Sequence, residues 1–556
     1  LSHDVEGSRK HLEDIFGDPP DLLLTDARYG FIFGAVKRTV TLGKEDRVHL
    51  SEMIDRVLTH RLLGPVILCL TLYLVYMFTF QGSDPVVGVF EAFFSWLGGA
   101  VTAALPEGLL RSLIVSGIID GVGGVLGFTP LIAFMFFAIA ILEDTGYMAR
   151  IAFMLDRVLR GFGLHGASML ALIVSGGIAG GCAVPGMMAT RTMKEPKERL
   201  VTILVTPLMN CGAKLPVYAL LIGAFFTQDK ATMMLLLTAV SWSMALLAAK
   251  VIRSTVLAGP SAPFVLELPP YRVPTLKALL IHTWERTWMY VKKAGTVILA
   301  ISIVLWAMMT FPGLSDEQMR GFKQREEALT AALLADPATS GIFKSPGDIV
   351  AFENYYQALG DNDAQESPSP SPGFRQLAVS LRQVKKSGSE GPAGGSMSGA
   401  AAAYSNFVKQ KQAIQLEKQT AGLRQTIGGR IGIALEWVFK PMGFDWRTNI
   451  ALVGGFAAKE VVVSTLGTAY SLGEVNPEAS EALGEKLRKE PGWSALKAFA
   501  LTLFVMLYSP CFVTLVVMRK ETGTFAWPLF AMLYTTGLAY CAAMVVFKVG
   551  SLLGLG

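Results

Sequence analysis

The sequence is poor in charged residues. Only 17% of its 556 residues are Asp, Glu, Lys or Arg, whereas an ordinary soluble domain has about 25%. Hydrophobic residues make up 52% of the chain, and they gather in runs close to the length that crosses a ~30 Å hydrocarbon core. We therefore predict an all-α polytopic membrane protein.

Cysteine and histidine are scarce, with five and six residues. All five cysteines lie within apolar runs, which is not typical of a disulfide framework. The phosphate-binding pattern Gly-x-x-x-x-Gly-Lys-Ser/Thr does not occur, and no set of acid, base and nucleophile stands out. We predict that this chain is not an enzyme. The net charge of +5 comes with Lys and Arg clustered in short loops, which indicates membrane topology rather than nucleic-acid binding.

The apolar runs divide the chain into four parts. Residues 1–61 are rich in charge and predict a cytoplasmic helical segment, the remnant of an upstream domain. Residues 62–312 and 430–556 predict the two halves of a membrane domain. Between them, residues 313–429 predict a polar extracytoplasmic insert that is partly disordered.

The insert has two segments of helical character, at 316–334 and 404–427. Between them lie tracts rich in Ser, Pro and Gly, at 367–373 and 391–399. Tracts of this composition are typical of linkers. We therefore expect two helices joined by linker-like chain.

Loop charges set the expected topology. His60 and Arg61 precede the first apolar run, which places the N-terminus in the cytoplasm. Two further segments, 85–106 and 271–293, fit helices lying at the membrane interface. We predict about seven crossings, over residues 62–80, 112–142, 201–226, 233–249, 294–311, 493–518 and 524–549.

A pattern interrupted by glycine and proline occurs twice. Residues 176–182 align with residues 454–460, and the segments before them, 155–165 and 435–445, align as well. Three crossings separate the two copies, so they face opposite ways. We predict two inverted gate-like repeats with re-entrant hairpins and interrupted helices, a recurring plan in transporters. We place the first hairpin at 167–190, because this keeps the basic loop after it inside.

Cysteines lie at the breaks of both repeats. Thiolates favour iron, zinc or copper over magnesium or calcium. Glu460 takes the position of Cys182 in the second repeat, and a carboxylate inside a membrane segment is functional by default. The alternative is that small residues merely allow close packing around inert cysteines. We predict a metal path formed by Cys182, Cys211, Cys511, Glu460, Asn210 and Ser509.

Further charged residues are candidates for ion exit or gating. Lys459 could neutralise Glu460 structurally, but adjacent residues on one helix do not face each other. Glu143 and Asp144 lie at the predicted inner membrane edge, close to Arg150. They form either a cap or salt bridge there, or contacts to a leaving ion. The candidate exit or gating residues are Glu143, Asp144, Arg150 and Lys459.

Together these motifs resemble the membrane domain of the FeoB family of ferrous-iron transporters. The resemblance is carried by Leu142–Arg150, Gly181–Pro185, Arg191–Thr192, Cys211–Tyr218, Ala457–Val463 and Tyr508–Cys511. It implies multi-pass uptake of Fe²⁺ across the bacterial inner membrane, with the N-terminus in the cytoplasm. It also implies that Cys182, Cys211 and Cys511, which fall on the family's motif cysteines, contact the iron. Thr145 and Lys214 depart from the family's usual Ser and Arg.

The resemblance also implies partners. Besides the lipid bilayer and ferrous iron as substrate, it implies an N-terminal GTPase domain in cis, which would bind GTP and Mg²⁺ and regulate or drive transport. A small cytoplasmic accessory protein and a homo-oligomer are further candidates, and no nucleic acid is expected. The alternative function is a nucleoside-type small-solute transporter of similar hairpin architecture. Thiols at the breaks favour the metal, since a nucleoside site would need polar amides and carboxylates.

Overall fold

In the computed structural model, the described part of the chain consists of helices and their connections, with no β-strand apart from one isolated bridge between Gly181 and Cys211. This confirms the predicted all-α class. Much of the helical segment predicted for residues 1–61 falls outside the described residues. The structure describes residues 11, 28–32, 34–35, 39, 46–106, 108–127, 129–177, 181–193, 195–226, 230–258, 270–359, 372–387, 396–470 and 481–554.

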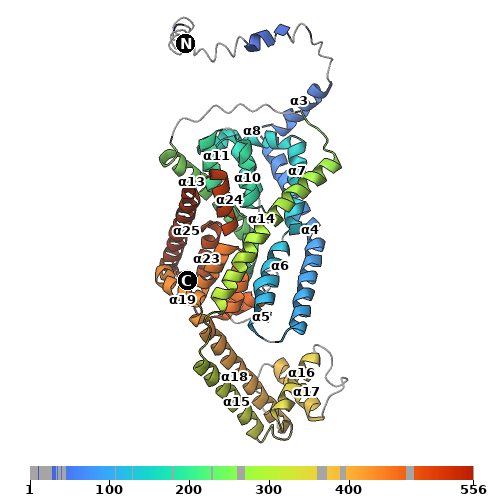
Figure 1. Ribbon diagram of the computed structural model, residues 1–556, viewed down its shortest axis with the longest axis vertical. Coiled ribbons are helices and arrows are strands. Elements are labelled where there is room, and N and C mark those ends of the chain that lie inside the picture. Colours follow the sequence, from blue (N-terminus) through green and yellow to red (C-terminus); the bar gives the residue numbers. More distant parts are fainter. Residues whose placement is uncertain are drawn as a thin grey trace.

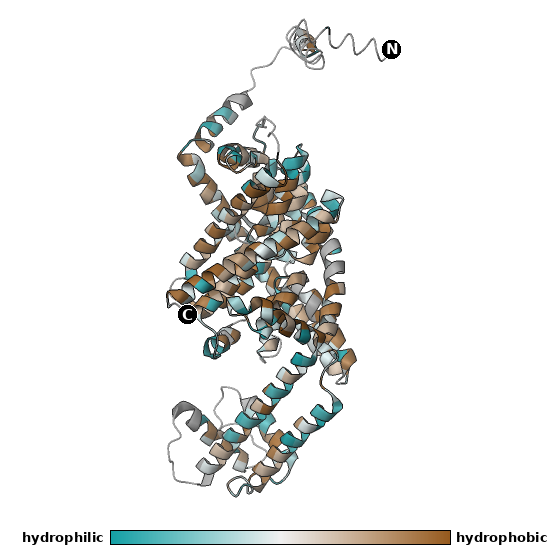
Figure 2. Ribbon diagram, turned by 90° about the vertical axis from the view of Figure 1, so that its left-hand side faces the viewer, coloured by the Kyte–Doolittle hydropathy of each residue, from teal (hydrophilic) through white to brown (hydrophobic). Residues whose placement is uncertain are grey.

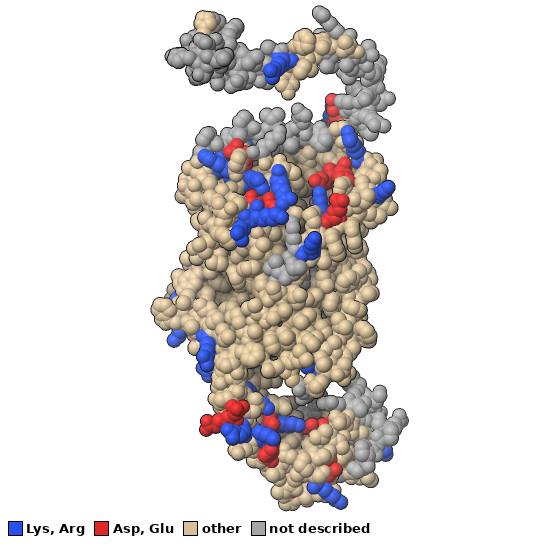
Figure 3. Space-filling view, viewed as in Figure 1, with Lys and Arg blue, Asp and Glu red and all other residues tan. Residues whose placement is uncertain are grey.

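The helices form an elongated bundle (Figure 1). We call the end with α3 (Asp46–Leu58) and α8 (Tyr147–Arg160) the α8 face, and the end with α15 (Asp316–Ala335) and α18 (Ser396–Gln425) the insert face. Apolar residues dominate the middle of the bundle (Figure 2). Charged residues gather toward the two ends, with a broad uncharged zone between them (Figure 3). Such a zone fits a bilayer, so the chain is a multi-pass membrane protein.

The described residues contain four or five segments that qualify as spans by length and composition, against the seven crossings expected for the whole chain. Among the described residues, four helical segments are long and apolar enough to cross a membrane, and a fifth forms if the bent pair α7–α8 counts as one span. The bend between α7 and α8 is 82°, and Gly146 allows it with a left-handed φ of 82°. The four are α4 (Leu63–Ala104), α13 (Lys230–Thr255), α23 (Ala495–Leu507) with α24 (Phe512–Thr522), and α25 (Ala526–Leu552).

The other predicted crossings are present as shorter or divided helices. The expected crossing at 112–142 consists of a π-helical turn at Leu113–Ile119, α6 (Asp120–Gly127) and α7 (Thr129–Asp144). It follows the short α5 (Leu109–Ser112). The crossing at 201–226 is divided between two helices. Breaks of this kind divide an apolar run that hydropathy alone presents as one segment.

Neither of the two segments predicted to be interfacial forms a separate helix. The helix α4 continues without a break through Pro85 to Ala104, so residues 85–106 extend the first span. Its 42 residues reach about 63 Å, roughly twice the hydrocarbon core. Likewise α14 (Leu276–Thr310) joins the basic segment and the crossing after it into one helix.

The two repeats run in opposite directions, as predicted. The first enters its hairpin from α8, and the second from α19 (Ile427–Phe439), at the other end of the bundle (Figure 1). The first repeat comprises α9 (Gly166–Leu172), α10 (Ala183–Ala189), α11 (Pro196–Val205) and α12 (Leu215–Phe225). The second comprises α20 (Trp446–Ala457), α21 (Val461–Ala469), α23 and α24, with α22 (Glu481–Lys489) before α23.

The insert folds around its own core. The helices α15 and α18 correspond to the two that the sequence predicted. Two more, α16 (Pro346–Leu359) and α17 (Pro372–Ser387), were missed. Buried aromatic rings join them, including Phe343, Phe352, Phe374 and Tyr404. Most of the two tracts predicted to be linkers lies outside the described residues.

Candidate functional site

The first hairpin folds back sharply on itself. Gly176 has a φ of 116°, and a Cβ there would lie 2.1 Å from the Asn210 carbonyl oxygen, so only glycine fits. On the returning arm of the hairpin, the Cys182 amide donates to the Val174 carbonyl at 2.9 Å. Cys182 then caps the start of α10 in an extended conformation. The hairpin tip thus holds the Cys182 thiol at a helix start.

The first interrupted helix meets this tip. Its two halves, α11 and α12, are separated by two short 3₁₀ turns around Cys211. The Gly212 amide donates to the Gly181 carbonyl at 2.8 Å, which satisfies backbone groups that the break leaves unpaired. The Asn210 side chain is buried and accepts from the Tyr218 hydroxyl at 3.1 Å. Cys182 and Cys211 are therefore brought to one junction.

The second hairpin tip is held by a lysine instead of a backbone bridge. The Lys459 ammonium donates to the Ser509 carbonyl at 2.7 Å and lies 2.9 Å from the centroid of the Tyr508 ring. No ion pair joins it to Glu460 among the described residues. Pairing of these two neighbours was one alternative from the sequence, and the structure has none.

The second interrupted helix breaks at Tyr508–Cys511, between α23 and α24. Cys511 caps the start of α24, and its thiol lies 3.0 Å from the Thr514 hydroxyl. The Ser509 hydroxyl donates to the carbonyl of Pro510, so this side chain is engaged locally. In geometry this junction mirrors the one in the first repeat.

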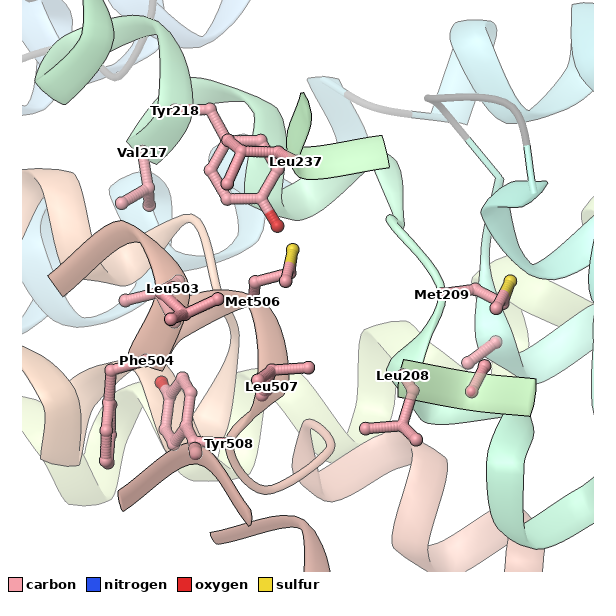
Figure 4. Packing of buried hydrophobic residues seen from close by; sticks show 14 of the residues in the cluster. Leu208, Met209, Val217, Tyr218, Leu237, Leu503, Phe504, Met506, Leu507 and Tyr508 are labelled. Carbon is pink, nitrogen blue, oxygen red and sulfur yellow. The ribbon is translucent and has the colours of Figure 1, made fainter. Parts of the chain in front are cut away.

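Side chains of both repeats pack together beside these breaks (Figure 4). Leu208, Met209 and Tyr218 from the first repeat belong to the same buried cluster as residues of α23 and its end. In a close-packed interior the helix halves support one another. Packing therefore holds the two breaks in a fixed relation. The residues from the second repeat in this view are Leu503, Phe504, Met506, Leu507 and Tyr508.

A cavity of about 100 Å³ lies where the breaks meet. Four of the six predicted metal ligands line it, contributed by both repeats. The other two, Asn210 and Ser509, do not line it and are buried with the partners described above. The polar groups that line the cavity are Cys182, Cys211, Cys511, Glu460, Lys214, Lys459 and Thr514.

The cavity has suitable donors for a soft or borderline cation, but it is not a closed metal centre. Among the described residues, no three His, Cys, Asp or Glu side chains are close enough to hold an ion. Three thiols and one carboxylate around one space are the donor types that Fe²⁺ and Zn²⁺ accept. A cation entering the cavity would meet them in turn or draw them together.

Two cavity residues were missed as site residues, Lys214 and Thr514. The Lys214 ammonium is buried and donates to carbonyl oxygens of both repeats. A lysine within an apolar stretch is itself a signal, because such charges are costly in a membrane. Thr514 carries no such signal in the sequence, since threonine is common in membrane helices.

The candidate exit residues other than Lys459 lie apart from the cavity, at the α8 face. Glu143 forms an ion pair with Arg286 at 2.8 Å, rather than with Arg150. The Arg150 guanidinium instead binds Asp55, with Nε 2.9 Å from Oδ1. Asp144 ends α7, at the bend into α8. Their role in ion exit stays a prediction.

The two repeats also match a known family model. The Gate family, described as nucleoside recognition, matches residues 125–225 and 423–525. A second model, described as the C terminus of ferrous iron transport protein B, matches residues 234–286. The two Gate matches cover both hairpins and both interrupted helices, which agrees with the internal repetition in the sequence.

Curated relatives extend the similarity over most of the chain. The chain is 32% identical to the Fe(2+) transporter FeoB of Campylobacter jejuni, covering 94% of the chain and 69% of that protein. It is 34% identical to FeoB of Helicobacter pylori, over 89% and 65%. It is 33% identical to an Fe(2+) transport protein A/Fe(2+) transporter FeoB fusion protein of Porphyromonas gingivalis, over 95% and 55%.

The chain thus spans between about half and two thirds of the length of these relatives. No solved structure matches it. The agreement of the repeats, the motifs and the relatives leads to one assignment. The chain belongs to the FeoB family of ferrous iron transporters and corresponds to its membrane domain.

Proposed function

We propose that this chain is the membrane-spanning part of a ferrous-iron uptake transporter, and that Fe²⁺ passes through the cavity between the two repeats. The observation that carries the proposal is the lining of that cavity. Thiols of Cys182 and Cys211 from one repeat and Cys511 from the other line it together with Glu460. The printed names of the relatives, Fe(2+) transporters, support ferrous iron as the cargo.

The loose arrangement of the donors suits passage better than storage. Conduction needs sites that bind a cation well enough to admit it and weakly enough to release it. The buried ammonium groups of Lys214 and Lys459 donate to backbone carbonyls, and neither forms an ion pair with Glu460. The Glu460 carboxylate therefore remains available for a cation.

The orientation of the protein in the membrane and the domain that drives or regulates transport are part of the same proposal. We assign the α8 face to the cytoplasm of a bacterial inner membrane, because the basic loop after the first hairpin lies there. Residues 1–61 would link to an upstream GTPase domain that binds GTP and Mg²⁺ and drives or regulates transport. The relative from Porphyromonas gingivalis is named as a fusion with Fe(2+) transport protein A, which supports a small accessory partner. Residues 313–429 would face outside.

A nucleoside-type transporter is the second candidate, since the Gate model is described as nucleoside recognition. A nucleoside needs polar groups that can hydrogen-bond its base and sugar. Neither Asn nor Gln is among the residues that line the cavity. The thiol-rich lining therefore favours the metal.

The test is uptake of radioactive Fe²⁺ by cells that carry the full-length protein. We expect Cys182→Ser, Cys211→Ser and Cys511→Ser each to lower uptake by about tenfold or more, as loss of metal contacts commonly does. Cys69→Ser and Cys541→Ser are matched controls, because these exposed cysteines lie outside the cavity. Wild-type uptake in all three cavity variants, at equal protein levels, would refute the thiol path.

A further inference from the structure

Two helices connect the cavity to the α8 face. The helix α10 directly follows Cys182 and ends at Ala189, and α24 directly follows Cys511 and ends at Thr522. They come from different repeats and pack against each other. At 1.5 Å per residue they extend about 10 and 16 Å away from the cavity. A cation leaving toward the α8 face would therefore have to pass between or beside them.

Apolar side chains fill the contact between these helices beyond the cavity. Val184 and Val513 line the cavity itself, and Met187 of α10 and Val517 of α24 are buried farther along the two helices, within one apolar cluster. A hydrated cation does not enter such packing, because it would lose its water without gaining ligands. Passage toward the α8 face thus requires α10 and α24 to separate.

The far ends of the two helices are joined by one carboxylate. Glu521, near the end of α24, accepts from Arg191 Nε at 3.0 Å and from Arg199 Nη2 at 2.8 Å. Arg191 lies in the 3₁₀ turn that follows α10, and Arg199 lies on α11. The Glu521 side chain is only 4% exposed, whereas the two arginines are 49% and 32% exposed. These ion pairs therefore join the two repeats where α10 and α24 would separate.

We propose that the ion pairs of Glu521 with Arg191 and Arg199 hold the metal path closed on the α8 side. We call these ion pairs the latch. The inference rests on the proposed metal path, since it assigns the closure of that path. It differs from the sequence-based expectation, which placed gating at Glu143, Asp144, Arg150 and Lys459. Glu521 is a positioning residue, because it contacts no cavity ligand and acts through α10 and α24.

Removing the carboxylate should favour the open gate. Without Glu521 two neighbouring guanidinium groups lose their shared partner and repel each other. The Glu521 carboxylate is buried, but both guanidinium groups are partly exposed, so removing the carboxylate weakens the closed arrangement moderately. Separation of α10 from α24 exposes Cys182 and Cys511 to water on the α8 face, so the accessibility of these thiols reports the gate directly.

The experiment measures thiol labelling in the full-length protein. A Cys69→Ser/Cys541→Ser background removes the two exposed cysteines. A charged, membrane-impermeant methanethiosulfonate reagent is applied to the α8 face in vesicles of known orientation, and modification of Cys182 and Cys511 is followed by mass spectrometry. We expect Glu521→Gln to raise the labelling rate about tenfold or more, as a weakened ion-pair latch should.

Two further variants separate the latch from a folding defect. Lys197→Gln is the matched control, because Lys197 lies on α11 beside Arg199 but donates to the Ala258 carbonyl. Its labelling should equal the wild-type rate. In the charge-reversed protein, Glu521→Arg with Arg191→Glu and Arg199→Glu, the latch is rebuilt with opposite signs, and labelling should return toward the wild-type rate.

The results test the latch and the thiol-lined iron path separately. A wild-type labelling rate in a folded Glu521→Gln protein would overturn the latch, whatever the iron result. Faster labelling in both Glu521→Gln and the charge-reversed protein would overturn it too, since restoring a pair of opposite charges would then not restore the closed state. Labelling requires no metal, so a confirmed latch with unimpaired iron uptake in the cysteine variants would refute only the thiol path.

Discussion

The Lys214 ammonium donates a 2.7 Å hydrogen bond to the carbonyl oxygen of Met506, and so ties the break of the first repeat to α23 of the second. It also donates to Met209 at 2.8 Å and to Pro207 at 3.3 Å. An ammonium has three donors, and all three are used. Lys214 therefore serves carbonyls that both interrupted helices leave without a helical partner.

Loss of this ammonium should weaken the joint between the repeats. Lys214→Met keeps the apolar stem but leaves buried carbonyls without a donor, at a cost of about 1–3 kcal/mol for each group. We expect a lower midpoint of thermal unfolding in detergent for this variant. Lys230→Met is the control, because Lys230 is exposed at the start of α13. Equal midpoints for the two variants would contradict the cross-linking role.

The first hairpin should tolerate no side chain at Gly186. A Cβ there would lie 1.8 Å from Ser175 Oγ and 2.7 Å from the Ala171 carbonyl oxygen, so the two arms would have to part. We expect Gly186→Ala to lower both thermal stability and iron uptake. Gly223→Ala should change neither, because its Cβ would meet nothing within 4 Å. Normal uptake by Gly186→Ala would mean that the hairpin is not closed during function.

At the α8 face Asp55 joins three segments that are distant in the sequence. Its carboxylate accepts from Arg150 Nη2 at 3.1 Å and from the Tyr271 hydroxyl at 2.7 Å. Burial alone would raise the pKa of Asp55. The hydrogen bonds from Arg150 and Tyr271 outweigh it, so the pKa lies below its ordinary value.

This lowered pKa fixes the sign of a pH effect. A carboxylate with a depressed pKa stabilises the fold above its unfolded pKa of about 4, and this stabilisation is lost as the pH falls through the folded value. We expect Asp55→Asn to unfold at a lower temperature than wild type between pH 5 and 8. The gap should narrow below about pH 4. A gap that is unchanged at pH 3 would contradict the role of this carboxylate.

The insert should be removable as a unit. Its two ends meet in the structure, where the Ile427 amide donates to the Phe311 carbonyl at 2.8 Å. Its aromatic core is separate from the core of the membrane helices. We expect a protein in which a short Gly-Ser linker replaces residues 315–425 to insert and fold normally, as judged by a monodisperse profile in size-exclusion chromatography. Aggregation of this variant alone would show that the membrane helices depend on the insert.

Local sequence patterns predicted the features that are themselves local. Glycine and proline mark breaks wherever they interrupt an apolar run, so the hairpin at 167–190 and the interruptions at Cys211 and Cys511 could be predicted. The partners of Lys214, Arg150 and Glu521 could not, because their contacts lie 95 to 330 residues away in the chain. Only the packed arrangement of the helices brings them together.

The helices of the insert were missed for a different reason. Its core is built from few, widely spaced aromatic residues such as Phe343 and Phe374. The neighbouring Ser-Pro and Gly-rich tracts predicted linkers, although the core residues Phe374, Leu377 and Ala378 recur at helical spacing. The continuous α4 was missed because residues 85–106 were predicted to form a separate interfacial helix, although neighbouring residues can accommodate a proline such as Pro85 within a membrane helix.

X-ray absorption at the zinc edge would test the central claim most directly. Zn²⁺ is a redox-stable substitute for Fe²⁺ and accepts the same thiolate ligands, at about 2.3 Å. With purified full-length protein in the Cys69→Ser/Cys541→Ser background, the account predicts a shell of sulfur scatterers at this distance. The number of sulfur scatterers in this shell should fall when Cys182 or Cys511 is changed to Ser. A shell of oxygen and nitrogen alone, unchanged by either substitution, would contradict a path lined by thiols of both repeats.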